Sequence, residues 1–308
     1  MVCCSGRSFR NGGHRPPLQF SKRYRYRGAN LRDPLSFARN IVSALRPGRY
    51  FWQGARLMSV GAYPLLFLTG LVAGLVDAIA GGGGIISVPV LLNLGLPPTL
   101  ALGTNKLQAS FGVVSATRHY ANNGLIDWRA CRLGIVTTLL GALGGAWAVQ
   151  RLDTQLLARI IPWLLAAIVV YSIVQPQVGG QDRPPRLGAG IFFTGFGLVL
   201  GFYDGFFGPG VGSFWIIALV LLLGCNFLQA TAHAKVMNAA SNLASLALFA
   251  LGGEVDYATG LVMGAGQIVG GRLGAGLAVQ RGARFVRPLF LTMVMAAMAR
   301  LIWLNLHR

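Results

Sequence analysis

Long apolar runs, separated by short polar or glycine-rich breaks, dominate the chain from about residue 58 onward. A helix needs about 20 consecutive apolar residues to cross the hydrocarbon core of a bilayer. The runs predict ten segments, near residues 61–80, 84–98, 103–121, 131–150, 157–175, 188–207, 211–225, 229–251, 257–279 and 285–305. The second and seventh are short, which favours half-helices or hairpin arms. We therefore expect an all-α polytopic integral membrane protein with about eight to ten transmembrane or half-membrane helices.

The membrane part is internally duplicated, with a first repeat in residues 58–180 and a second in residues 181–308. The matching blocks are Gly70–Asp77 with Gly197–Asp204, Gly124–Trp128 with Gly253–Tyr257, and Gly141–Arg151 with Gly271–Arg281. Seven of the eleven positions in the third pair of blocks are identical. The offset between the repeats drifts from 127 to 130 residues along the chain, which indicates short insertions between the blocks.

The distribution of loop charges predicts that the second repeat is inverted relative to the first. Five segments separate equivalent points, and an odd number of crossings reverses the direction. Inversion places eight arginines on one side: Arg118, Arg129, Arg132, Arg183, Arg186, Arg281, Arg284 and Arg287. The other side receives Arg151, Arg159 and the acidic loop of Glu254 and Asp256. An excess of Lys and Arg marks the cytoplasmic side.

Composition supports a lipid-facing chain, because 54% of the 308 residues are hydrophobic and only 11% are charged. Soluble domains are about 25% charged. The formal net charge of +19 does not indicate nucleic-acid binding, because 12 of the 27 Lys and Arg residues lie in residues 1–57. The Cys and His residues do not have the spacing of metal ligands, so we expect neither a metal nor a cofactor.

Residues 1–57 form a basic extension that is rich in Arg, Gly and Pro and has no lasting periodicity. We expect it to be disordered. The preferred interpretation is that translation starts at Met58, directly before the first apolar run. A basic tail that binds anionic lipid and a transit peptide are the alternatives.

Two glycine-rich breaks interrupt apolar segments at matching places in the two repeats. The break glycines are Gly81, Gly82, Gly83 and Gly84 in the first repeat, and Gly208 and Gly210 in the second. Unwound backbone at membrane depth is tolerated only where protein or a water-filled cavity satisfies it. Each break frees N–H groups, and the helix that restarts after it points its positive end into the gap. Pro89 is expected in the first turn of that restarted helix.

Two lysines lie at equivalent positions beside the breaks, Lys106 in the first repeat and Lys235 in the second. Polar residues continue along one face of each helix, at Asn105, Gln108, Gly112 and Ser115 and at Lys235, Asn238, Asn242 and Ser245. Such a stripe is costly against lipid. Lysine cations and free N–H groups together favour a small anion with several acceptor oxygens. Snorkelling lysines and simple interhelical hydrogen bonds are the alternatives.

Asp77 and Asp204 directly precede the two breaks, at the negative ends of their helices. One or both are candidates to bind a proton that is coupled to transport. A structural ion pair with a lysine or an arginine is the alternative. His233 occupies the place of Thr104 in the other repeat and is a candidate substrate contact, although a hydrogen bond in the core is the preferred interpretation.

These residues resemble the TauE/SafE family of membrane transporters, over roughly residues 61–305. The most specific feature is the pairing of the segment Asp77–Gly84 with the segment Ala101–Lys106. The segment Gly201–Gly210 is similar to the YfcA-like branch of the family. The resemblance implies a multi-pass permease or exporter of the bacterial inner membrane for sulfur-containing anions such as sulfite or organosulfonates. It also implies that the break glycines, Asn105 and the two lysines form the site.

We therefore predict a secondary transporter for small anions, with the lipid bilayer, the anion and a coupling proton as partners. Val211 and Ala234 stand where the family pattern suggests hydroxyl residues, which affects fine selectivity. An organic carboxylate carrier and a non-transporting scaffold are the alternatives. We expect no enzyme, because Ser87 and Ser213 follow the breaks without a histidine at an equivalent spacing to both. The oligomeric state stays open.

Overall fold

The computed structural model describes residues 62–174 and 184–281, and within these ranges the chain is helical with short connections. The helices are α3 (Ala62–Ala80), α4 (Gly83–Asn93), α5 (Pro98–Asn122), α6 (Trp128–Val149), α7 (Thr154–Val174), α8 (Ala189–Phe206), α9 (Val211–Leu222), α10 (Phe227–Leu251) and α11 (Tyr257–Arg281). The basic extension, Met58, the tenth predicted segment, and Arg183, Arg284 and Arg287 lie outside the described residues. The prediction of an all-α polytopic protein is confirmed.

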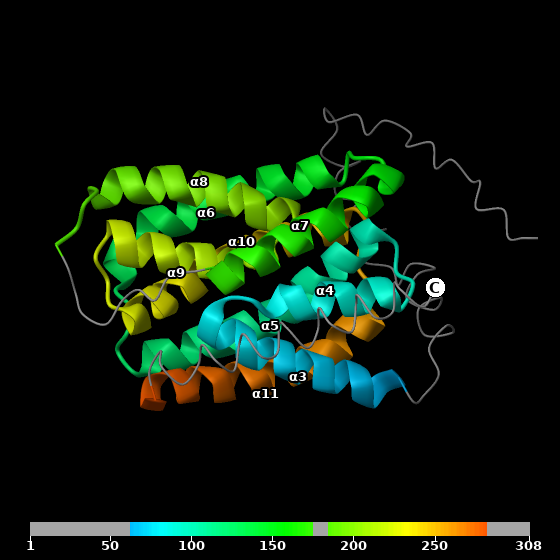
Figure 1. Ribbon diagram of the computed structural model, residues 1–308, viewed down its shortest axis with the longest axis horizontal. Coiled ribbons are helices and arrows are strands. Elements are labelled where there is room, and N and C mark those ends of the chain that lie inside the picture. The colour runs from blue at the N-terminus through cyan, green and yellow to red at the C-terminus, as the bar shows by residue number, and fades with distance from the viewer. Residues whose placement is uncertain (1–61, 175–183, 282–308) are drawn as a thin grey trace, which may run out of the picture. The chain divides into compact units, whose positions relative to one another are not determined.

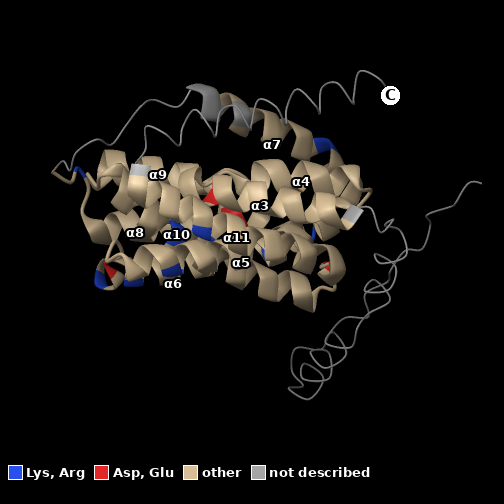
Figure 2. Ribbon diagram, turned by 90° about the horizontal axis from the view of Figure 1, so that it is seen from below, with Lys and Arg blue, Asp and Glu red and all other residues tan. Residues whose placement is uncertain are grey.

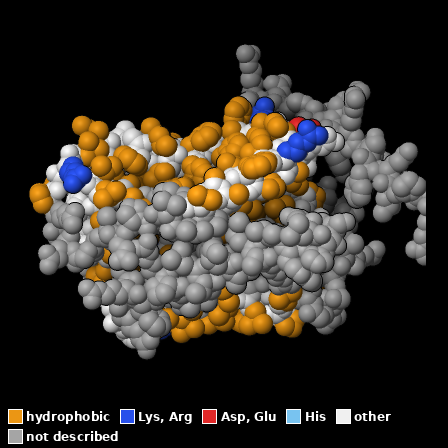
Figure 3. Space-filling view, viewed as in Figure 1, with side chains coloured by type: hydrophobic (Ala, Val, Ile, Leu, Met, Phe, Trp, Pro, Cys, Tyr) orange, Lys and Arg blue, Asp and Glu red, His pale blue; other side chains and the backbone are white. Residues whose placement is uncertain are grey.

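Five of the described helices, α3, α6, α8, α10 and α11, are long and apolar enough to cross a membrane. The short second and seventh segments are confirmed as α4 and α9, with 11 and 12 residues. Large apolar side chains are exposed on the described surface, and Trp163 and Ile191 are 78% and 72% exposed. Figure 3 shows such side chains over much of the visible described face. A lipid environment accounts for this exposure.

The start of α5 and the interior of α4 differ from the sequence prediction. The second segment was expected to continue to residue 98, but α4 ends at Asn93 because Gly95 adopts a positive φ of 85° and two prolines follow. Pro98 opens α5, where its missing N–H costs nothing. The prediction for Pro89 is wrong: it lies inside α4 rather than in its first turn, because α4 already begins at Gly83.

The helices of the two repeats pack across each other rather than within separate halves. α3 lies along α11, and the equivalent pair α8 and α6 packs in the same way on the other side (Figure 1). Glycines bring the backbones together. A Cβ at Gly74 would lie 2.7 Å from the carbonyl oxygen of Gln267, and one at the equivalent Gly201 would lie 2.4 Å from that of Thr138. Small residues permit such close helix approach in membranes.

α5 and α10, the helices that carry the two lysines, also pack against each other. α5 also contacts α11, and α10 contacts the equivalent helix of the first repeat, α6. Acidic and basic segments come close together in the interior of the bundle as well as at helix ends (Figure 2). The inversion of the second repeat remains a prediction.

Candidate functional site

Both glycine breaks contain a left-handed glycine at the same place, where the preceding helix ends. α3 ends at Ala80 and is followed by Gly81 with φ of 75°, whereas α8 ends at Phe206 and is followed after one residue by Gly208 with φ of 98°. Gly81 and Gly208 occupy equivalent positions, 127 residues apart. A left-handed conformation is inexpensive only for glycine. The structure therefore requires glycine at both places to stop one helix and start the next.

The two breaks lie against each other in the structure. A Cβ at Gly81 would lie 2.3 Å from the Cα of Gly212, and a Cβ at Gly84 would lie 3.0 Å from the Cα of Pro209. The hydroxyl of Ser213 donates a hydrogen bond of 2.6 Å to the carbonyl oxygen of Ala80, which the end of α3 leaves free. The unwound segments of both repeats thus meet at one place.

Lys106 forms a fully buried ion pair with Asp204 beside this meeting point. Lys106 Nζ lies 2.5 Å from Asp204 Oδ1, with side chains 1% and 2% exposed. It also donates to the backbone carbonyl of Asp204 at 2.5 Å. The hydroxyl of Ser241 donates to the second carboxylate oxygen, Oδ2. A Cβ at Gly208 would lie 2.7 Å from Lys106 Nζ, so this glycine also makes room for the ammonium group.

Lys235 forms the second ion pair, with Asp77. Lys235 Nζ donates to Asp77 Oδ2 at 2.9 Å, and the lysine is fully buried while the carboxylate is 18% exposed. The other carboxylate oxygen accepts a long hydrogen bond of 3.4 Å from the backbone N–H of Gly83, in the first turn of α4. The positive end of the restarted helix therefore faces Asp77 and offsets the unfavourable end of α3.

The two ion pairs are reciprocal across the duplication. Lys106 and Lys235 occupy equivalent positions, and so do Asp204 and Asp77. Each lysine pairs with the aspartate of the other repeat. Both aspartates thus form an ion pair with a lysine, as the alternative interpretation expected. A coupled proton remains a hypothesis, because an ion pair can also exchange its partner when the carboxylate is protonated.

A row of amide and hydroxyl groups continues from the first break along α5. Ser87 donates to Asn105 Oδ1 at 2.6 Å, and Gln108 Nε2 donates to the same oxygen at 2.7 Å. Gln267 Nε2 of α11 donates to Gln108 Oε1 at 2.6 Å. All four side chains are buried. The polar face predicted for α5 therefore points into the protein, as a network that crosses both repeats.

The equivalent face of α10 also points inward. Asn238, Asn242 and Ser245 are buried together with Lys235. A Cβ at Gly212 would lie 2.9 Å from Asn238 Nδ2, which places this amide against the meeting point of the breaks. Among the described residues, Asn238 Oδ1 has no hydrogen-bond partner although it is buried. Such an acceptor is costly unless a further group satisfies it.

His233 does not join this cluster. Its Nε2 accepts a hydrogen bond of 3.2 Å from the backbone N–H of Asp127, the N-cap of α6. Thr104, at the equivalent position, accepts a bond of 2.9 Å from the backbone N–H of Asp256. Thr104 of α5 thus holds the start of α11, and His233 of α10 holds the start of the equivalent helix, α6. The preferred interpretation of His233, a hydrogen bond in the core, agrees with this geometry.

Most of the candidate residues come together at the breaks. They are Asp77, Gly81, Gly83, Gly84, Lys106, Asp204, Gly208, Lys235 and Asn238. Gly82 is the N-cap of α4 and Gly210 is the N-cap of α9, and the latter approaches α7 at Ile168. Sequence reasoning missed Ser241, which lies one position beside the predicted stripe on α10. It also missed Gln267, whose amide within an apolar segment was the available signal.

Comparisons with known proteins identify relatives over most of the chain. The family model described as "Sulfite exporter TauE/SafE" matches residues 66–301. A "Probable membrane transporter protein" of Haemophilus influenzae is 43% identical over 239 residues, covering 78% of this chain and 94% of the relative. The "Probable membrane transporter protein YfcA" of Escherichia coli K12 is 41% identical, covering 78% and 89%. No solved structure shows a significant match.

Proposed function

Because the chain belongs to the sulfite exporter TauE/SafE family of membrane transporters, we propose that it is a secondary transporter for small sulfur-containing oxyanions in a bacterial inner membrane. Sulfite and organosulfonates are the proposed substrates. The observation that carries the proposal is the pair of reciprocal ion pairs, Lys106 with Asp204 and Lys235 with Asp77, beside the abutting glycine breaks. Discontinuous helices that meet at a charged centre are typical of transporter substrate sites.

The two lysines supply the charge that a transported anion would need. Each is held by an aspartate in this structure, so an incoming oxyanion has to replace a carboxylate. Protonation of the aspartate would release the lysine, and an oxyanion would then take the place of the carboxylate on the ammonium group. Anion and proton would consequently move together. The inverted relation of the repeats would let the two pairs exchange roles between inward-open and outward-open forms.

The Lys235–Asp77 pair is the better candidate for first contact with the anion. Asp77 is 18% exposed, whereas both partners of the other pair are almost completely buried. Among the described residues, the carboxylate of Asp77 accepts one long backbone hydrogen bond besides that of its lysine, whereas the carboxylate of Asp204 also accepts one from the Ser241 hydroxyl. The less enclosed carboxylate, which also has fewer close hydrogen bonds, is the easier one for an anion to displace from its lysine.

Transport in proteoliposomes tests the proposal. Vesicles that contain the full chain are challenged with sulfite, thiosulfate, taurine, sulfoacetate and simple carboxylates, with and without a proton gradient. Both electrical current and tracer flux are recorded. We expect flux of sulfur oxyanions that is lost in Lys106→Ala and Lys235→Ala. Flux of carboxylates alone would retain the architecture and discard the sulfur assignment.

Substitution of the aspartate Asp77 tests proton coupling separately from substrate choice. Asp77→Asn leaves Lys235 without a carboxylate to displace, so we expect anion flux that no longer depends on the proton gradient. A pH profile of Asp77→Asn that matches the unchanged protein would contradict the coupling. If neither the folded unchanged protein nor any folded variant transports a compound of the panel, the result would favour the scaffold alternative.

A further inference from the structure

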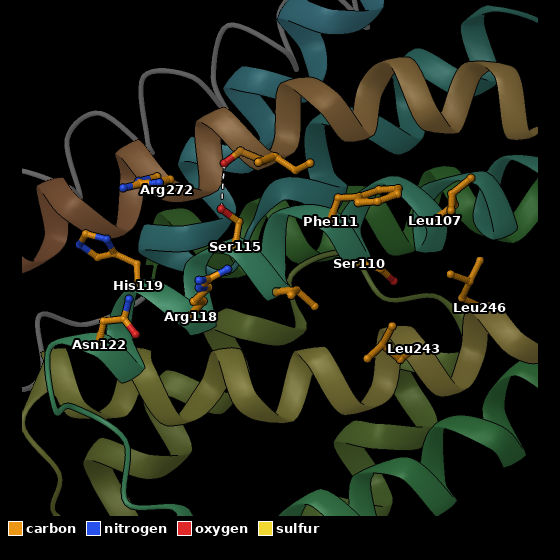
Figure 4. A pocket seen from close by; sticks show the side chains of 12 residues that line it. Leu107, Ser110, Phe111, Ser115, Arg118, His119, Asn122, Leu243, Leu246 and Arg272 are labelled. Atoms are coloured by element: carbon orange, nitrogen blue, oxygen red, sulfur yellow. Dashed lines mark hydrogen bonds between the residues drawn. The ribbon is translucent and has the colours of Figure 1, made fainter.

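A groove with a cavity volume of about 660 Å³ lies between α5, α10 and α11, away from the ion pairs. Its two ends differ in chemistry. Toward the middle of the helices the walls are apolar, with Leu107, Phe111 and Leu246, and toward the C-terminal ends of α5 and α11 they carry Arg118 and Arg272. Figure 4 shows Arg118, Arg272, His119, Asn122 and Ser115 gathered at one end, and Leu107, Phe111, Leu243 and Leu246 at the other, together with Ser110.

The geometry points to a binding site for one anionic phospholipid. We propose that its phosphate binds between Arg118 and Arg272, with Ser115, His119 and Asn122 beside it, and that one acyl chain lies along the apolar wall. Guanidinium groups bind phosphate through paired hydrogen bonds. Basic pockets between transmembrane helices on the cytoplasmic side are suited to anionic headgroups.

The length of the groove matches one leaflet of a bilayer. From Leu107 to Arg118 the helix rises by about 16 Å at about 1.5 Å per residue. One leaflet contributes about 15 Å to a hydrocarbon core of about 30 Å. A lipid with its phosphate at Arg118 would therefore place the end of its chain near Leu107. A small oxyanion would leave the apolar wall empty, which favours the lipid.

The direction of the helices places the polar end on the predicted cytoplasmic side. α5 and α11 start together, because Thr99 of α5 donates to Glu254 at 3.0 Å and Thr104 accepts from the Asp256 amide. Arg118 and Arg272 near their other ends are thus far from this acidic loop. Charge distribution predicts that the acidic loop faces the outside, so the arginines face the leaflet with the anionic surface.

Neither arginine of the polar end has a basic residue at the equivalent position of the other repeat. The apolar wall is shared, since Val114 and its equivalent Leu243 both line the groove. The groups at the polar end have apolar equivalents: Ala247 for Arg118, Leu248 for His119, Leu251 for Asn122 and Ala142 for Arg272. The duplication alone therefore does not account for the cluster of cations. Neither guanidinium forms an ion pair with any residue in the described ranges, and both side chains are exposed.

Lipid retention in detergent tests the proposal. The full chain is purified with equal amounts of dioleoylphosphatidylglycerol and dioleoylphosphatidylcholine, and retained lipid is counted by native mass spectrometry. We expect one phosphatidylglycerol per chain, reduced at least fivefold in the double variant Arg118→Gln/Arg272→Gln. The matched control is Arg129→Gln/Arg132→Gln, which removes two exposed cations from the start of α6, outside the groove. The control should retain lipid like the unchanged protein.

Several outcomes would overturn the assignment. Equal retention by the groove and control variants would show unspecific attraction to the basic surface, and equal retention of phosphatidylcholine would exclude a headgroup site. Displacement of the lipid by millimolar inorganic phosphate or sulfite would identify a vestibule for free anions instead. Leu243→Ser tests the apolar wall independently, and unchanged retention there would contradict the placement of the chain. Because the readout is lipid binding, these results do not depend on whether the transport proposal holds.

Discussion

Lys235 Nζ lies 2.9 Å from Asp77 Oδ2, although 158 positions separate the two residues in the chain. The equivalent lysine, Lys106, contacts the equivalent aspartate, Asp204, across the same boundary between the repeats. The interior of the protein is therefore fixed by two charge contacts that neither repeat makes within itself. We expect stability to depend on these contacts and, under the proposed function, transport as well, which gives several measurable consequences.

Removing one member of the buried pair should cost more than removing both. Lys106→Met leaves the carboxylate of Asp204 buried without its counter-ion, a loss of about 3–5 kcal/mol. Lys106→Met/Asp204→Asn removes both charges and should recover most of that loss. Thermal unfolding in detergent measures both variants. A double variant as unstable as the single one would show that the charges do not act as a pair.

The partly exposed pair provides a comparison within the same molecule. Lys235→Met should destabilise less than Lys106→Met, because water reaches Asp77, which is 18% exposed, and compensates part of its charge. The same unfolding assay ranks the two variants. The reverse order would contradict the difference in enclosure.

Gly208→Ala should damage the site more than its backbone conformation alone explains. Its φ is 98°, and the new Cβ would lie 2.7 Å from Lys106 Nζ. Gly95→Ala is the matched control, since Gly95 has φ of 85° and open space around it, so that it bears only the conformational cost of about 1–2 kcal/mol. We expect transport to survive in the control and to fail in Gly208→Ala. Equal effects in the two variants would indicate backbone strain alone.

Glu254 and Asp127, two loop carboxylates, should respond to pH with opposite signs. Burial raises the pKa of Glu254, against a smaller lowering by the Thr99 hydrogen bond. Its contribution to stability is present below the ordinary carboxyl pKa of about 4.3 and is lost as the pH rises through the raised value. Glu254→Gln should therefore gain in melting temperature relative to the unchanged protein as the pH rises.

Asp127 supplies the contrasting case. Backbone hydrogen bonds from Ala130 and Arg129 lower the pKa of this N-cap. Its contribution is present above the ordinary pKa of an aspartate and is lost as the pH falls through the lowered value. The disadvantage of Asp127→Asn should accordingly shrink on acidification. Melting temperatures of both variants and of the unchanged protein are measured between about pH 2 and pH 8, and differences that do not change with pH would contradict the two environments.

His233→Thr should preserve both fold and transport. Thr104 already performs the same task in the first repeat, where its hydroxyl accepts the amide N–H of Asp256. A threonine at position 233 would offer the same acceptor to the amide of Asp127, whereas His233→Leu would leave that N–H unsatisfied. Flux measurements on folded protein test this. Selective loss of flux in His233→Thr would return His233 to the substrate site.

Sequence patterns predicted the elements of the site better than their connections. Hydrophobic periodicity located the described helices and the two short ones after the breaks, because glycine and proline limit helices locally. Lys106 and Asp77 were also recognisable from the sequence, because charged residues are rare in apolar segments. Their partners could not be assigned, since each contact joins residues 98 or 158 positions apart, and either aspartate was available to either lysine.

Local propensity also misplaced one residue. Pro89 was expected near a helix start, where proline is common. The structure starts α4 earlier, because Gly83 already satisfies its N–H with Asp77, and the tertiary contact outweighs the local preference. Ser241 escaped notice because the neighbouring Asn242 fits the helical spacing equally well. Only the position of Asp204 distinguishes them.

The cross-paired lysines also bear on how such a chain could arise. In this structure each lysine pairs with the aspartate of the other repeat, so a single repeat inserted alone would lack both of these ion pairs. A half-length ancestor would have had to meet a second copy of itself, each copy completing the other. Fusion of the two genes would then have turned a contact between molecules into a fold. Each half of the present protein thus still supplies the counter-ions of the other half, as a partner subunit would.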